Sequence, residues 1–172
     1  YFNELGCRIS DHALEFIMYR PATSQEIETI FENRLNGQMP SKEDELKFKT
    51  AFMIFVGKEY HKHNWAMQLH YGAQRDNNTP MYKQLGPDTG YDSIYDYFSS
   101  LEMSQFLDAL NSTNELPKTI IYSLNPQDDS TIVTTMGCFQ DSSVVGKLQH
   151  GSAWWFNDHK KGMEDQMTSL AN

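Results

Sequence analysis

Strand-like and helix-like segments alternate four times along the chain, and this alternation constrains the fold more than any other feature of the sequence. Four short apolar runs have the length and composition of strands: residues 7–12, 65–71, 118–124 and 147–155. Segments with the apolar spacing of helices separate them. Such alternation is typical of α/β folds with a parallel sheet, in which functional side chains gather at the carboxyl ends of the strands. We therefore expect an α/β fold.

Capping residues mark the expected helix boundaries. Thr23 and Glu26 form a T-x-x-E capping box, and Gly37 follows the apolar face of that helix. Ser41 is the start signal of a second helix, which we expect to reach about Lys62. Three more helices are expected around residues 103–110, over residues 131–139 and after a cap at Asp158.

Composition narrows the classes of function. The 172 residues are 39% hydrophobic, which suffices for a packed core. The 14 Lys and Arg against 23 Asp and Glu give a net charge of −9, which disfavours binding to nucleic acids or anionic membranes. No apolar run reaches the roughly 18 residues of a membrane span. Cys7 and Cys138 suggest no metal site and no disulfide framework, so we expect a cytoplasmic location.

The ends of the sequence are unusual. It begins at Tyr1 rather than at a methionine, and it stops within what is predicted to be an amphipathic helix. Four strands are too few to close a barrel. We therefore interpret residues 1–172 as a single fragment of one domain, truncated at both ends.

Polar side chains follow the ends of the expected strands. Asp11 ends the first strand, His70 ends the second, and Arg75 comes soon after, in a polar loop over residues 72–92. Loops of this length are usually functional or disordered. Taken singly, Asp11 is typical of a turn, His70 of a core and Arg75 of a surface. Together they would combine an acid–base pair with a guanidinium suited to a carboxylate.

A histidine pair, His61 and His63, stands at the expected end of the second helix. Residues two apart on a helix point about 200° away from each other, so these two cannot grip one metal ion. We interpret them as a solvated helix end, where a cationic side chain suits the helix dipole.

Two adjacent tryptophans, Trp154 and Trp155, end the last strand-like run. Successive strand residues point to opposite faces, so one ring would face the site and the other the helical layer. The spacing alone does not decide which of them faces the site.

Several segments of the chain resemble the uronate isomerase family, also called glucuronate isomerase, in the amidohydrolase superfamily. They are "GCRISDHAL" (6–14), "FKTAFMIFVGKEY" (48–60), "LHYGAQRDNN" (69–78), "LGPDTGYDSI" (85–94), "LPKTIIYSLNP" (116–126) and "GSAWWFNDHKKGMEDQM" (151–167). They occur in family order with family-like spacing. The resemblance implies a partial TIM-type (β/α)8 barrel, about strands 4–7 with their helices.

The resemblance also implies an activity. Family members are aldose–ketose isomerases of hexuronate catabolism that interconvert D-glucuronate with D-fructuronate and D-galacturonate with D-tagaturonate. A proton leaves C2 of the sugar acid and a proton is delivered to C1. The match to family motifs assigns Asp11 and His70 as catalytic residues, and Arg75 and Trp154 as substrate-binding residues. Trp155 would then face the helical layer.

A metal ion is the last implication of the resemblance. The family binds a divalent metal, usually zinc, through an H-x-H pair on strand 1, and an aspartate in a T-D-S-R segment on strand 8 completes the site. Neither segment occurs here, so the metal ligands are expected outside these residues and no metal-binding residue is assigned. We expect the fragment alone to be inactive, and a homo-oligomer or a self-associating fragment. The alternatives are a metal-dependent hydrolase of the same superfamily and a non-catalytic α/β fragment.

Overall fold

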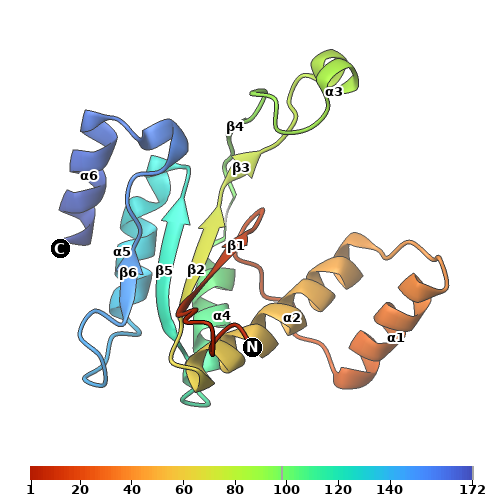
Figure 1. Cartoon of the computed structure of the whole chain (residues 1–172), viewed down its shortest axis with the longest axis horizontal. Coiled ribbons are helices and arrows are strands. Elements are labelled where there is room, and N and C mark those ends of the chain that lie inside the picture. Colours follow the sequence, from red (N-terminus) through yellow and green to blue (C-terminus); the bar gives the residue numbers. More distant parts are fainter. Residues whose placement is uncertain (98, 172) are drawn as a thin grey trace. The chain divides into compact units, whose positions relative to one another are not determined.

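The computed structural model describes residues 1–97 and 99–171, and the described part is an α/β structure (Figure 1). Four of its strands form one sheet in the order β1-β2-β5-β6. They are β1 (Ile9–Ala13), β2 (Ala66–Tyr71), β5 (Lys118–Ser123) and β6 (Leu148–His150). Strands β5 and β6 pair in parallel, with Ile121 opposite His150. The predicted α/β class is confirmed.

The chain divides into two compact units, each of which is described by itself. The first comprises residues 1–10, 17–67 and 99–118, and the second comprises residues 11–16, 68–98 and 119–172. The division passes through β1, β2 and β5, so that the carboxyl ends of these strands belong to the second unit. All four residues predicted for the site, Asp11, His70, Arg75 and Trp154, are therefore in the second unit.

The first unit contains α1 (Ser24–Leu35), α2 (Lys42–Lys62) and α4 (Ser100–Asn111). The capping box is confirmed: the Thr23 side chain accepts from the backbone of Glu26, whose carboxylate accepts from the backbone of Thr23. Gly37 follows α1 with a φ of 85°, a left-handed conformation that favours glycine. Helix α2 begins after its Ser41 cap and ends at Lys62, as predicted. It packs on α4, where Leu110 contacts Gly57.

The histidines at the end of α2 have separate partners. The Nδ1 atom of His61 is 3.2 Å from the carbonyl oxygen of Leu116, and His63 is 3.8 Å from the carboxylate of Glu59. Both side chains are exposed. The two residues therefore form an exposed helix end, as the sequence predicted.

In the second unit, two helices pack beside β6, the edge strand of the sheet. Helices α5 (Asp129–Gly137) and α6 (Lys160–Leu170) pack on each other, and both contact β6 (Figure 1). Short 3-10 turns, η1 (Pro126–Asp128) and η2 (Trp155–Asn157), precede them. The buried apolar side chains of this unit are Leu69, Tyr71, Ile121, Leu124, Ile132, Met136, Phe139 and Leu148.

Two predictions about the last segment are wrong. Strand β6 ends at His150 rather than continuing to residue 155, and Trp155 begins a 3-10 turn with a φ of 53°. Pairing stops because the chain leaves β5 after the Gly151 amide has bonded to the carbonyl of Ile121. Asp158 does not cap α6; the cap is His159, whose Nδ1 atom accepts from the backbone of Gly162.

The polar loop after β2 has structure of its own. It contains β3 (Ala73–Gln74) and α3 (Thr79–Leu85), and it leads to β4 (Ser93–Ile94). Strands β3 and β4 pair antiparallel, so the start and the end of the loop are held together. This pairing brings Arg75 back beside the residues that precede β4.

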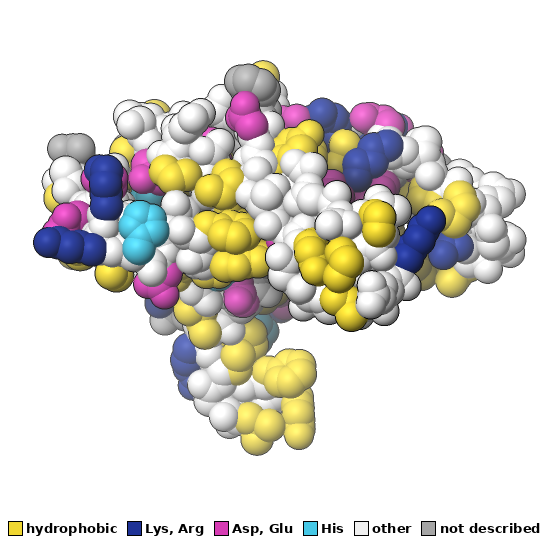
Figure 2. Space-filling model, turned by 90° about the horizontal axis from the view of Figure 1, so that it is seen from above, with side chains coloured by type: hydrophobic (Ala, Val, Ile, Leu, Met, Phe, Trp, Pro, Cys, Tyr) yellow, Lys and Arg dark blue, Asp and Glu magenta, His cyan; other side chains and the backbone are white. Residues whose placement is uncertain are grey.

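Large hydrophobic side chains remain exposed in both units. Met39 and Phe55 are 80% and 63% exposed in the first unit, and Met167 is 58% exposed in the second. Figure 2 shows hydrophobic side chains on the upper face in separate patches between charged ones. None of the helices among the described residues has the length and hydrophobicity needed to span a lipid bilayer.

Candidate active site

A histidine near the carboxyl end of β2 and an aspartate in the middle of β1 form a close pair. The His70 Nδ1 atom is 2.6 Å from the Asp11 Oδ1 atom. Side chains alternate along β2, with Met67, Leu69 and Tyr71 buried and His70 on the opposite face. The His70 side chain is 15% exposed and the Asp11 side chain is 61% exposed. The pair is therefore well oriented and still accessible to a ligand.

Aromatic rings surround the imidazole of His70. The Tyr122 ring stacks on it with centroids 4.0 Å apart and planes 11° apart. The Trp154 ring meets it edge-on at 4.6 Å. Burial, and then the charge of Asp11, raise the pKa of Tyr122, so that its hydroxyl stays protonated and donates to the Gln68 side chain at 2.8 Å. These rings restrict His70 on two sides.

The loop after β2 fixes the guanidinium of Arg75. Gly72, with a φ of 94°, turns the chain out of β2, and a side chain there would also press on the Leu124 backbone. The Nη1 atom of Arg75 is 2.8 Å from an Asp92 carboxylate oxygen and 3.2 Å from one of Asp88. The backbone N–H of Asp76, and then Arg75, lower the pKa of the nearly buried Asp92 carboxyl. An ionised Asp92 therefore holds the arginine in place.

The Arg75 guanidinium also lies over the ring of Trp155, 5.2 Å from its centroid. Trp155 is 39% exposed and contacts the Trp154 ring at 5.8 Å, so the expectation that it faces the helical layer is wrong. That expectation assumed strand alternation, whereas the left-handed φ of Trp155 turns its ring to the same cluster. One tryptophan contacts His70 and the other contacts Arg75.

The structure thus brings Asp11, His70 and Trp154 into direct contact, and it connects Arg75 to them through Trp155. Their catalytic and binding roles stay predictions. Sequence reasoning missed three of the surrounding residues: Tyr122, Asp92 and Trp155. Tyr122 carried a signal as a polar aromatic residue at the end of the β run "KTIIYSL", and Trp155 carried the same spacing signal as Trp154.

Comparison with known protein families shows to which family this chain belongs. A family model described as "Glucuronate isomerase" matches residues 1–172. The chain belongs to the glucuronate isomerase family. It is 63% identical to the uronate isomerase of Lachnospira eligens and 62% identical to that of Lachnoclostridium phytofermentans. Each match covers all of this chain and 37% of the relative, so the chain spans little more than a third of their length.

Solved structures of this family have the same fold. The chain superposes on uronate isomerase from Thermotoga maritima with a TM-score of 0.86 at 31% identity, covering 99% of this chain and 36% of that one. Glucuronate isomerase from Caulobacter crescentus gives a TM-score of 0.81 at 22% identity, which supports the fold alone. The chain is thus one portion of the TIM-type barrel of the glucuronate isomerase family, as the resemblance implied.

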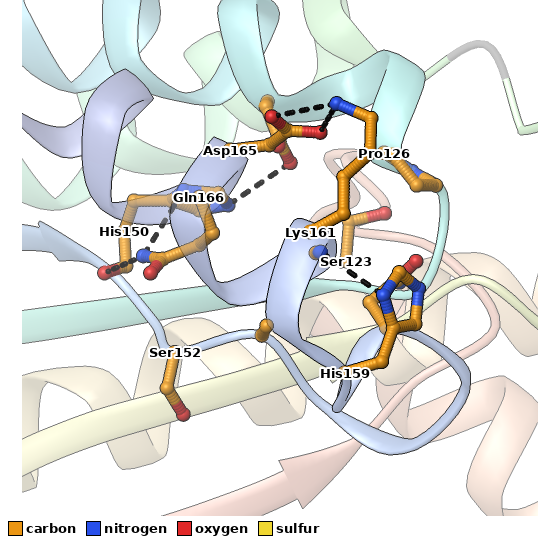
Figure 3. Close-up of a pocket in the computed structure, with 12 residues that line it drawn as sticks. Ser123, Pro126, His150, Ser152, His159, Lys161, Asp165 and Gln166 are labelled. Atoms are coloured by element: carbon orange, nitrogen blue, oxygen red, sulfur yellow. Dashed lines mark hydrogen bonds and ion pairs between the residues drawn. The ribbon is translucent and has the colours of Figure 1, made fainter.

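A separate cavity of about 300 Å³ opens between the end of β6 and α6 (Figure 3). Its lining includes His150, Asp129, Asp165 and Gln166, and none of the four predicted site residues. Burial lowers the pKa of His150 to about 4. Burial, and then the charges of Asp128 and Asp165, raise the pKa of Asp129 to about 6.

The described residues of this family member do not form a metal site by themselves. Within residues 1–97 and 99–171, no three His, Cys, Asp or Glu side chains are close enough together to hold a metal ion. The described residues bring together a His–Asp pair, a guanidinium held by carboxylates and three aromatic rings.

Proposed function

We propose that this chain supplies one wall of the active site of a uronate isomerase, which interconverts D-glucuronate with D-fructuronate and D-galacturonate with D-tagaturonate. Membership of the glucuronate isomerase family over all 172 residues supports this proposal. The observation that carries it is the 2.6 Å contact between His70, near the carboxyl end of β2, and Asp11 of the neighbouring strand β1. In barrels of this type, active sites are built at that end of the strands.

His70 and Asp11 act on the oxygen atoms of the open-chain substrate. Because Asp11 occupies Nδ1 and fixes the ring, Nε2 is the nitrogen that meets a substrate oxygen. From there it polarises the C1 or C2 oxygen and moves a proton between them as the carbonyl changes place. The carbon-bound proton is transferred by groups outside these residues.

Arg75 and Trp154 bind the substrate in this proposal. The guanidinium of Arg75 is 47% exposed and can pair with the C6 carboxylate while Asp92 holds it from behind. Trp154 places an apolar edge beside His70 and excludes water from the reacting oxygens.

The segment works as part of a longer chain in this proposal. A divalent metal, zinc by preference, would be bound by residues outside this segment, because the H-x-H pair and the T-D-S-R aspartate that the resemblance implies do not occur in it. We infer that the segment alone is inactive and that the whole enzyme is a homo-oligomer. The free cysteines Cys7 and Cys138 fit a cytoplasmic location.

A chimera tests the proposal. These 172 residues would replace the matching 37% of the Lachnospira eligens uronate isomerase, and the purified, metal-loaded protein would be incubated with D-glucuronate or D-galacturonate. We expect ketose formation, which a ketose-specific colour reaction or NMR detects. The unaltered relative is the positive control, and the segment alone should give no ketose. Hydrolysis of an ester or amide by the chimera without any ketose would assign it to the hydrolases instead.

A further inference from the structure

A row of contacts crosses the sheet in strand order, from β1 to the residue that follows β6. Asp11 of β1 contacts His70 of β2, and His70 stacks on Tyr122 of β5. Tyr122 in turn lies against Gly151, the first residue after β6. The row therefore ends at a position that has no side chain.

Gly151 leaves the space that the Tyr122 ring fills. A Cβ atom built on Gly151 would come within 3.0 Å of three ring carbons of Tyr122, Cγ, Cδ1 and Cε1, a separation that real Cβ atoms do not show. Gly151 is buried and has no left-handed φ, so the backbone itself would accept alanine. The need for glycine here comes from the ring of Tyr122.

Tyr122 is held at two further points. Its hydroxyl donates to Gln68, which is two residues before His70 and so on the same face of β2. Its ring is nearly parallel to the imidazole, with the planes 11° apart and the centroids 4.0 Å apart. Tyr122 thus contacts His70, Gln68 on the same face of β2, and Gly151 after β6.

We propose that Tyr122 is a positioning residue for His70, and that Gly151 is required because it admits the Tyr122 ring. The catalytic part of this inference rests on the proposed isomerase function. Asp11 fixes the in-plane direction of the imidazole through Nδ1, and Tyr122 fixes the tilt of the ring plane. A catalytic group misplaced by about 1 Å loses about 100-fold in rate, so the tilt of His70 matters to turnover.

A double-mutant cycle in the chimera tests this assignment. Tyr122→Ala should lower kcat about 10- to 100-fold with a smaller change in KM, while Tyr122→Phe keeps the ring and most of the activity. Gly151→Ala should lower kcat at least as much, because the ring is displaced. Combining Gly151→Ala with Tyr122→Ala should return kcat to the level of Tyr122→Ala alone, whereas combining it with Tyr122→Phe should not. Gly137→Ala is the matched control, since a Cβ there meets nothing within 4 Å.

A second readout does not depend on activity. In histidine-labelled protein, the ring protons of His70 should show an upfield ring-current shift in the unsubstituted chain and in Tyr122→Phe, and lose it in Tyr122→Ala. If the chimera forms no ketose but the His70 shift is lost only in Tyr122→Ala, the isomerase proposal fails, and the contact by which Tyr122 positions His70 is still supported. If ketose forms while Tyr122→Ala retains both kcat and the His70 shift, or if Gly151→Ala is harmless, the positioning role is refuted.

Discussion

Two His–Asp pairs lie on opposite faces of the sheet, and their environments differ sharply. His70 pairs with Asp11 at 2.6 Å, and both side chains reach solvent. His150 is 3.5 Å from Asp129, and these side chains are only 3% and 15% exposed. His150 is paired with Ile121 in the ladder and shares its buried face, whereas His70 shares a face with Tyr122. The same two residue types therefore make an accessible pair and a buried one.

The partners of the second ring nitrogen distinguish the pairs further. Both nitrogens of His150 face protein groups: Nε2 is 3.5 Å from Asp129, and Nδ1 faces Gln166 (Figure 3). His70 has Asp11 on Nδ1, and its Nε2 atom is the one that we propose meets a substrate oxygen. A histidine whose two nitrogens face protein groups supports packing, and one with a free nitrogen can move protons. We therefore expect substitution of His70 to affect activity and substitution of His150 to affect stability.

The largest expected effect is the loss of activity in His70→Asn. Removing a positioned acid–base group should lower kcat about 10²- to 10⁴-fold, with little change in stability because His70 is outside the buried core. Steady-state assay of the chimera with D-glucuronate measures it. His63→Asn, at the exposed end of α2, is the matched control and should keep full activity. Equal activity in the two variants would break the distinction between the pairs.

The reverse outcome is expected for His150→Ala. The substitution removes a buried ring from contact with Gln166 and Asp129, which should cost about 2–4 kcal/mol of unfolding free energy through the cavity and the unpaired polar groups. Urea unfolding of the chimera measures the loss, and kcat per folded molecule should stay unchanged. If His150→Ala left the unfolding free energy unchanged but abolished turnover, the catalytic role would belong to the His150–Asp129 pair instead.

Lowering the pH should change stability through His150 and Asp129, by a smaller amount and in opposite directions for the two residues. The folded pKa of His150, about 4, is below the ordinary 6.5, so its contribution to stability is present above pH 6.5 and is lost as the pH falls toward 4. The folded pKa of Asp129, about 6, is above the ordinary 3.8, so its penalty is full above pH 6 and is relieved toward pH 4. Each contribution amounts to about 1–2 kcal/mol between pH 6.5 and 5, with opposite signs.

Single substitutions separate these two contributions. Asp129→Asn should lose more stability than the unsubstituted chimera when the pH falls from 6.5 to 5, and His150→Gln should lose less. Urea midpoints at the two pH values measure both, and titration of all other groups cancels in the comparison. Identical acid responses in the three proteins would show that this pair is not shielded from water.

Strand alternation predicts the face of the sheet on which each histidine lies. In "AMQLHY", His70 falls on the face opposite Met67, Leu69 and Tyr71, so its position outside the core follows from a period of two. In "KLQH", Leu148 and His150 share a face, which the same rule makes the buried one. The capping signals at Thr23 and Ser41 were equally local and equally reliable.

What the sequence could not predict depends on tertiary contacts. The end of β6 at His150 follows from where pairing with β5 stops, and no residue in "GSAWW" marks that point. The clamp of Arg75 by Asp92 needs the antiparallel pairing of β3 with β4, which joins residues 17 apart. The left-handed φ of Trp155 is contrary to the preference of a bulky residue, so alternation placed its ring wrongly.

The smallest expected effect is that of substituting Trp155. It tests whether the aromatic rings around His70 contribute to substrate binding, which the polar side chains around His150 are not expected to do. The face of Trp155 attracts the Arg75 guanidinium with about 0.5–1 kcal/mol, so Trp155→Leu should raise KM for D-glucuronate about 2- to 5-fold and leave kcat nearly unchanged. Trp155→Phe should have less effect because a ring remains. Phe156→Leu is the control, since that ring stacks on Trp155 rather than contacting the arginine. A fall in kcat without a rise in KM would mean that Trp155 acts on His70 through Trp154, and not on the substrate carboxylate through Arg75.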